Sequence, residues 1–214
     1  MSDPFLDWFG ALEARHRANL TFQEIRRALQ ALSSLYVERR SRISSGAALD
    51  GAGKRAAFAL YYGPLHFLLV REIVRALSAT APPLARLVDL GCGTGIAGAA
   101  WALEAGGRPF VEGIDSSAWA VAETRWTLSS CGLRGHASKG DLVTAPLPAG
   151  PAGVVAAFTV NELTEPQREH LLPRLLEVAR SGVRVLVVEP LSRRVSPWWP
   201  AWATQWVTAG GRRG

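Results

Sequence analysis

The chain has 214 residues, of which 48% are hydrophobic and 20% are charged. This composition is typical of a folded globular protein and excludes a disordered one, and the length allows one sizeable α/β core with an appended segment. The two cysteines, Cys92 and Cys131, are far apart in the sequence, without the clustered spacing of a zinc or iron–sulfur site. We therefore expect no bound metal.

The sequence has neither a secretory nor a membrane signature. Asp3 and Asp7 stand where a signal peptide would have basic residues. Arg71, Glu72 and Arg75 interrupt the longest apolar stretch, so that none reaches transmembrane length. We expect a soluble, cytoplasmic protein that binds no membrane.

The net charge is +6 and the pI is about 10.1. Residues 1–82 carry 11 basic and 7 acidic residues, an excess of +4, and the remainder carries 13 and 11, an excess of +2. A basic surface suits a polyanionic partner such as RNA, because binding of phosphates releases their counterions. The alternative is a solvated, arginine-rich helix surface with no such partner.

Residues 1–82 are predicted to form a helical N-terminal segment, a candidate substrate-binding region. Asp3-Pro4 has the pattern of a helix start, and Thr21 with Glu24 that of a capping box. We expect the second helix to end at residues 44–46. A third helical stretch from about Gly53 contains Gly63-Pro64, which predicts a break or restart there.

From residue 83 onward, short β-branched runs alternate with helical patterns, which predicts a parallel sheet with helices on both faces. The predicted strands are 84–90, 109–114, 135–139, 153–160 and 183–188. The predicted helices are 94–105, 117–131 and 165–180, the last begun by a capping box at 164–167. Residues 83–214 are thus expected to be a Rossmann-like α/β core.

A glycine-rich loop follows the first predicted strand, in the run Val88–Ala102. Gly91, Gly93 and Gly95 allow a sharp turn and the close approach of a ligand to the backbone. Asp89 precedes them. A carboxylate there would repel the pyrophosphate of a dinucleotide, whereas it tolerates or attracts the ammonium and sulfonium groups of a methionyl ligand. The loop therefore favours S-adenosylmethionine over NAD.

Two further acids follow the next two predicted strands. Asp115 has the position of an acid that accepts hydrogen bonds from a ribose diol, and the alternative is that it caps the following helix. Asp141 can accept from an adenine amino group while Leu142 packs on the ring, and the alternative is a plain turn residue.

The fourth predicted strand contains Thr159 near its end and is followed by Asn161 and Glu162. The methyl acceptor is expected to meet the sulfonium at this edge of the sheet. Asn161 and Glu162 are the candidate catalytic residues, because they can position the nucleophile, although either can equally brace the next helix.

Through Asp89-Leu90-Gly91-Cys92-Gly93-Thr94-Gly95, Asp115 and Asp141, the chain resembles the class I S-adenosylmethionine-dependent methyltransferase family over about 84–190. In that family, the glycine loop holds the methionyl part, the acid after the second strand binds ribose, and the acid after the third reads adenine. The resemblance therefore implies S-adenosylmethionine as cofactor. The cofactor-binding residues are expected to be Asp89, Gly91, Cys92, Gly93, Thr94, Gly95, Asp115, Ser116, Asp141, Leu142 and Thr159.

More of the chain is similar to the methyltransferase-like proteins associated with the mitochondrial small ribosomal subunit and their bacterial relatives. The similarity is carried by Leu35-Tyr36, Tyr61-Tyr62-Gly63-Pro64, Asn161-Glu162-Leu163 and Val187-Val188-Glu189-Pro190. It implies a role with ribosomal RNA or in ribosome assembly. The cysteines of an iron–sulfur cluster, which some members have, are absent here.

Only 24 residues follow Pro190, so we expect the C-terminal strand hairpin that usually closes the family's sheet to be missing. The fifth strand would then be an open edge, which allows self-association. A predicted helix carries Trp198, Trp199, Trp202 and Trp206; they either pack on the sheet or form a stacking platform for bases.

The most direct interpretation is a methyltransferase that carries out in-line methyl transfer, with ribosomal RNA as the favoured acceptor. Three alternatives remain open: a cofactor-binding ribosome-assembly protein with little or no catalysis, a small-molecule methyltransferase and an NAD-dependent oxidoreductase.

Overall fold

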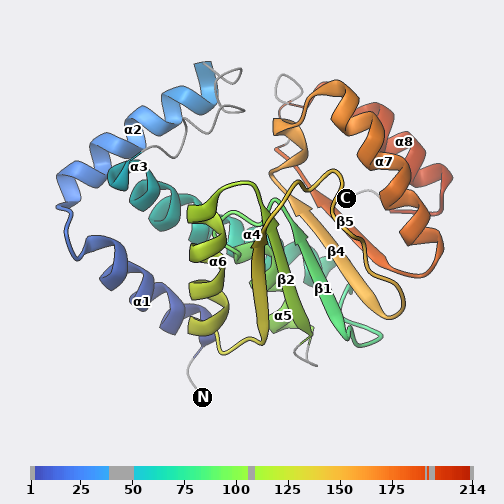
Figure 1. The fold of residues 1–214 in the computed structure, drawn as a ribbon, viewed down its shortest axis with the longest axis horizontal. Helices are drawn as coiled ribbons and strands as arrows, with labels where there is room; N and C mark the ends of the chain where they lie inside the picture. The colour runs from blue at the N-terminus through green and yellow to red at the C-terminus, as the bar shows by residue number, and fades with distance from the viewer. Residues whose placement is uncertain (1–2, 39–50, 106–108, 191, 193–195, 213–214) are drawn as a thin grey trace.

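The computed structural model describes residues 3–38, 51–105, 109–190, 192 and 196–212. Five parallel strands form one sheet in the order β3-β2-β1-β4-β5 (Figure 1). They are β1 (Arg86–Leu90), β2 (Phe110–Asp115), β3 (Gly135–Lys139), β4 (Ala152–Ala157) and β5 (Arg184–Val188). The predicted Rossmann-like fold is confirmed.

Helices cover both faces of this sheet (Figure 1). They are α5 (Ile96–Glu104), α6 (Ala118–Ser130), α7 (Glu165–Arg180) and α8 (Trp199–Thr208). Strand side chains alternate between the two faces, so that Leu87 and Val155 join the core beneath α5, whereas Val88 and Val154 join the core beneath α7 and α8.

The strand order reverses between β1 and β4. β1 pairs with β2 on one side and with β4 on the other, both in parallel. The connections that leave β1 and β4 therefore go to opposite faces, and a crevice opens at the carboxyl ends of these two strands. In open α/β sheets this is the usual place of the ligand site.

The N-terminal segment is helical, as predicted. It contains α1 (Pro4–Arg17), α2 (Phe22–Glu38), α3 (Ala52–Ala57), the π-helix η3 (Phe58–Tyr62) and α4 (Gly63–Ala76). The side chain of Asp3 caps α1 by accepting from the Phe5 N–H at 3.0 Å, and Thr21 and Glu24 form the predicted capping box. The expected end of the second helix at 44–46 lies outside the described residues.

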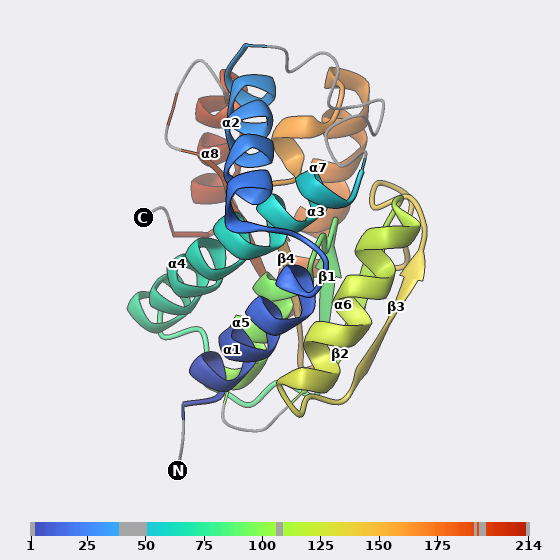
Figure 2. The same ribbon diagram turned by 90° about the vertical axis from the view of Figure 1, so that its left-hand side faces the viewer.

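At Gly63-Pro64 one helix ends and the next begins, but the chain continues along the same helical path. Pro64 has no N–H to donate to the preceding turn. The turn before it widens into η3, in which the Gly63 N–H donates to the Phe58 carbonyl, and α4 begins at Gly63. η3 and α4 consequently run on as one rod across the sheet (Figure 2).

The N-terminal helices share one hydrophobic core with the sheet. Trp8 and Leu12 of α1 and Phe67 of α4 are buried in the same cluster as Leu87 and Val111 of the strands. The two predicted regions, 1–82 and 83–214, are therefore packed together.

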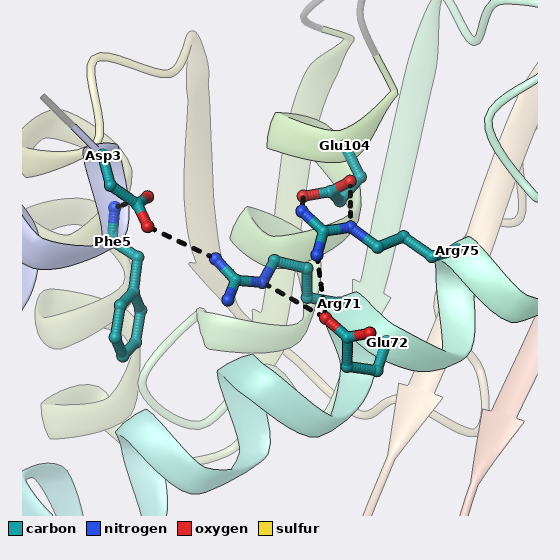
Figure 3. Close-up of polar contacts among 6 residues, drawn as sticks. All are labelled: Asp3, Phe5, Arg71, Glu72, Arg75 and Glu104. Carbon is teal, nitrogen blue, oxygen red and sulfur yellow. Dashed lines mark hydrogen bonds and ion pairs between the residues drawn. The ribbon is translucent and has the colours of Figure 1, made fainter. Parts of the chain in front are cut away.

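Ion pairs add to this packing (Figure 3). Arg75 of α4 donates to both carboxylate oxygens of Glu104 of α5, at 2.8 Å each. Arg71 pairs with Asp3 at 3.7 Å, which ties the start of α1 to α4.

A buried carboxylate fastens α1 to α6, and the two helices lie side by side (Figure 2). Glu123 of α6 is only 1% exposed; it accepts from Arg15 at 3.1 Å and contacts His16 Nε2 at 2.6 Å. Burial raises the pKa of Glu123, but the hydrogen bonds and charges of His16 and Arg15 outweigh this effect and hold the pKa below its usual value.

The C-terminal part agrees with the predictions except at the end of β4. Within the described residues β5 pairs with β4 alone and no strand follows it. Trp202 is buried in the core beneath α7, with Trp198 and Trp206 packed against it, so these tryptophans fill the interior. The predicted extension of the fourth strand to residue 160 is wrong: β4 ends at Ala157 because Phe158 adopts a φ of +58°.

Among the described residues, no helix is long and apolar enough to cross a membrane.

We predict that Glu123→Gln lowers the free energy of unfolding by about 1.5–3 kcal/mol at pH 7, because hydrogen bonds to a buried charged group are lost. Since the folded-state pKa is depressed, the contribution of Glu123 is present above its ordinary value of 4.5 and is lost as the pH falls through the folded-state pKa. Urea denaturation of both proteins at pH 7 and in acid measures this difference.

Glu13→Gln is the matched control, because Glu13 forms an exposed pair with Arg17 at 3.6 Å on the same helix. It should change the stability by less than about 0.5 kcal/mol. Equal stability of Glu123→Gln and wild type at pH 7 would contradict this account of how α1 is held.

Candidate functional site

A cavity of about 750 Å³ lies at the carboxyl ends of the strands. The segments that follow β1, β2, β3 and β4 line it, together with η3 and α4. Of the residues predicted for the site, all but Gly95 line this cavity. Segments far apart in the sequence are therefore brought together in a space of ligand size.

The three glycines of the loop after β1 all have positive φ but differ in what surrounds them. A Cβ on Gly91 would lie 2.1 Å from Thr159 Oγ1, and one on Gly95 would lie 2.8 Å from Thr124 Cγ2. A Cβ on Gly93 would meet only Phe58, at 4.0 Å. Gly91 and Gly95 are thus required by packing within the protein, and Gly93 is the one that leaves space for a ligand.

Asp89 is buried beneath the loop, only 1% exposed, and its Oδ2 accepts from the Gly98 N–H at 2.9 Å. Burial raises the pKa of Asp89 to about 7; the Gly98 hydrogen bond lowers it and the charge of Asp115 raises it further. At neutral pH the group is only partly ionised. Asp115 is a second acid at the loop, where it accepts directly from the Gly93 N–H, and the role of Asp89 toward a methionyl ligand stays a prediction.

Asp115 links two segments that border the cavity. Its Oδ2 accepts from the Gly93 N–H at 2.9 Å and its Oδ1 accepts from the Ser117 N–H at 2.8 Å. Ser117 itself caps α6 by accepting from the Ala120 N–H. Each Asp115 oxygen has a further lone pair, which suits it to accept from ligand hydroxyls while it fixes the loop.

The loop side chains Cys92 and Thr94 are oriented differently. Cys92 Sγ points beneath the loop, where it accepts from Thr124 Oγ1 at 3.2 Å, and burial raises the pKa of the thiol well above its usual value. Cys92 therefore faces the cavity with its backbone and not with its side chain. Thr94 lines the cavity, is 2% exposed, and its Oγ1 has no hydrogen-bond partner among the described residues.

The segment after β3 forms another wall. Asp141 Oδ1 accepts from the Val143 N–H at 2.9 Å, so the turn role that we considered for Asp141 is present. Asp141 and Leu142 nevertheless line the cavity, as does Ser116 after β2. Their roles toward a ligand stay predictions.

A carboxylate that we did not predict braces the segment after β4. Glu189, which follows β5, accepts from the backbone N–H groups of Val160 and Asn161 at 2.9 and 3.3 Å, and from Asn161 Nδ2 at 2.5 Å. Asn161 lies in the short helix η4 (Val160–Glu162), and its amide is thus tied to the end of β5. Whether Asn161 positions a nucleophile or braces the next helix stays a prediction. Glu162 and Thr159 line the cavity beside it.

Four aromatic residues of the cavity were also missed: Phe58, Tyr62 and His66 of the N-terminal helices, and Phe158 after β4. The His66 ring stacks on Phe158, with centroids 3.8 Å apart. Burial lowers the pKa of His66 to about 4, so the ring is neutral at neutral pH. The four-residue spacing of 58, 62 and 66 was visible in the sequence, but it indicates a helix face without showing what that face contacts.

Residues 87–182 match a family model described as "Methyltransferase domain". No curated protein matches the chain. The mitomycin 7-O-methyltransferase MmcR is 17% identical, with a TM-score of 0.55 over 90% of this chain and 56% of its own. A putative O-methyltransferase from Nostoc punctiforme is 16% identical, with a TM-score of 0.55 over 85% of this chain and 58% of its own.

CalS10, an amino pentose methyltransferase from Micromonospora echinaspora solved with bound S-adenosylmethionine, is 27% identical, with a TM-score of 0.44 over 56% of this chain and 50% of its own. The chain spans about half the length of these solved proteins, and the likeness to MmcR and the Nostoc protein concerns the fold. Together with the family match, this fold confirms the resemblance to class I methyltransferases. Residues 87–182 are thus similar to a methyltransferase domain, and the fold is the one expected from the sequence.

Proposed function

We propose that the chain is an S-adenosylmethionine-dependent methyltransferase and that the cofactor occupies the cavity at the carboxyl ends of the strands. The observation that carries the proposal is that the loop residues 91–94, Asp115 and Asp141 come together around one space. In this order along three successive strands, they suit the methionyl, ribose and adenine parts of the cofactor.

The described residues fit this group. Thr94 has a buried hydroxyl that no described residue hydrogen-bonds, which suits the carboxylate or ammonium of a methionyl group. Gly93 leaves open the space that a side chain would fill. Asp115 presents two acceptors at the same edge, as a ribose diol requires.

The cofactor supplies the methyl group as a sulfonium, and the chain supplies the positioning. In-line displacement needs the nucleophile, methyl carbon and sulfur held collinear. The loop is rigid because Asp115 fixes Gly93 while Thr159 and Thr124 pack against its other glycines. Glu189 holds the segment at Asn161 on the acceptor side.

For the acceptor, we propose RNA, in particular ribosomal RNA. The support is the charge excess of +4 on residues 1–82, the segment that contributes Phe58, Tyr62 and His66 to the cavity. The small-molecule and non-catalytic alternatives, a cytoplasmic location and self-association through β5 stay predictions.

Thr94→Val tests the cofactor site without disturbing the fold. Because the Thr94 hydroxyl has no partner in the part of the chain that the structure describes, we expect unchanged thermal stability and an affinity for S-adenosylmethionine and S-adenosylhomocysteine about three- to tenfold lower. Titration calorimetry measures both affinities. Thr127→Val is the control, since Thr127 is equally buried and unpartnered but lies outside the cavity; an equal loss in both variants would refute the assignment.

Alanine substitutions separate the two uses of glycine in the loop. We expect Gly91→Ala to cost more than about 3 kcal/mol of stability, because its Cβ meets Thr159. Gly93→Ala should cost only about 1–2 kcal/mol of backbone strain yet bind the cofactor at least tenfold more weakly. Gly132→Ala is the control, because Gly132 has a φ of +63° and open space around it. This variant should lose a similar amount of stability through backbone strain and bind the cofactor as tightly as the wild type. Wild-type affinity in Gly93→Ala would contradict the site.

Transfer of a tritiated methyl group from S-adenosylmethionine tests the activity and the acceptor. Small ribosomal subunits, bulk RNA and a low-mass metabolite extract serve as separate substrates. We expect label in the RNA, reduced with Thr94→Val. Label only in metabolites would favour a small-molecule enzyme, and cofactor binding without any transfer would favour the non-catalytic role.

A further inference from the structure

Three side chains of the N-terminal helices form an aromatic row along one wall of the cavity. Phe58, Tyr62 and His66 occupy successive turns of η3 and α4, with ring centroids 5.8 Å apart at each step. The row ends where His66 stacks on Phe158. It thus extends from the glycine loop to the carboxyl end of β4, where donor and acceptor are to meet.

The position of the row is fixed at both ends. Phe58 lies over Gly93, 4.0 Å from where a Cβ would stand, and its ring packs edge-on against Trp119 of α6. The hydroxyl of Tyr62 is hydrogen-bonded to Ser33 of α2. With the hydroxyl held by α2, the part of Tyr62 that remains for the cavity is its ring.

This wall carries no formal charge. His66 forms no ion pair within the part of the chain that the structure describes, and burial keeps its pKa near 4. The carboxylates of Asp89 and Asp115 accept from the backbone N–H groups of Gly98 and Gly93. Lys139, which also lines the cavity, follows β3 beside Asp141.

We propose that the aromatic row Phe58, Tyr62 and His66 recognises the positive charge of the methyl donor and so distinguishes the sulfonium from the neutral thioether product. The inference rests on the proposed function. The face of an aromatic ring attracts a cation through its quadrupole, most strongly where water is excluded. A neutral product of the same shape lacks this attraction.

An aromatic wall suits the reaction better than a carboxylate would. As the methyl–sulfur bond breaks, its electron pair stays on sulfur, which becomes a neutral thioether, and the methyl carbon bonds to the acceptor. A carboxylate beside sulfur would stabilise the charged ground state and raise the barrier. The weaker attraction of ring faces retains the donor while stabilising its charged ground state less than a carboxylate would. This attraction disappears once the charge is gone, which favours exchange of product for fresh donor.

The test is calorimetric titration of the full chain with S-adenosylmethionine, S-adenosylhomocysteine and an amine analogue that is positively charged at the position of the sulfonium. Tyr62→Leu and Phe58→Leu remove a ring, Tyr62→Phe keeps it, and Phe110→Leu removes a ring at the amino end of β2. We expect the ratio of affinities, charged ligand over neutral product, to fall roughly three- to tenfold in each of the first two variants. Tyr62→Phe and Phe110→Leu should keep the wild-type ratio.

The outcomes separate this inference from the proposed function. If the wild type binds donor and product but neither ring-removing variant changes their ratio, the inference is wrong and the proposed function stands. The inference is equally wrong if both affinities fall in parallel, because the row would then be merely structural. If the wild type binds neither molecule, both proposals are wrong. If removal of a ring lowers the ratio of affinities to the neutral product for both the donor and the amine analogue, the result supports recognition of charge.

Discussion

The hydrogen bond from the Gly93 N–H to the Asp115 carboxylate is the interaction on which the cavity depends. It joins the loop after β1 to the end of β2, and the other oxygen of Asp115 joins the same point to the start of α6. Gly91 and Gly95 allow this closure because Thr159 and Thr124 occupy the space of their missing side chains. A loop held in this way is rigid before any ligand arrives, and preorganisation of this kind lowers the cost of binding.

The N-terminal helices also help to form the cavity. Their core is continuous with that of the sheet, and the buried pair between Glu123 and His16 holds α1 against α6. The restart at Gly63-Pro64 keeps η3 and α4 on one path, so that Phe58, Tyr62 and His66 all reach the cavity. Folding of the helical segment and formation of the site are therefore coupled.

The sequence predicted the parallel sheet, the helices and the loop well, because each depends on local periodicity, caps and glycines. The end of β4 was missed because the positive φ of Phe158 is imposed by its surroundings: its N–H donates to Val188 of the neighbouring strand. The partner of Asn161 was missed for a similar reason, since Glu189 reaches it only through the pairing of β4 with β5. The aromatic row was not predicted, because a helical period reveals a face and not whether that face meets protein or an open space.

The distribution of charge differs from the simplest expectation for a cationic ligand. The sequence suggested a loop carboxylate that tolerates or attracts the cation; in the structure Asp89 is buried against α5, and burial raises its pKa to about 7. The carboxylates of this site instead organise backbone: Asp89 the start of α5, Asp115 the glycine loop, and Glu189 the turn at Asn161. Because these carboxylates form the hydrogen bonds that shape the cavity, we assign the attraction for a positive donor to the neutral ring faces. Ring faces bind a cation less tightly than an ion pair would.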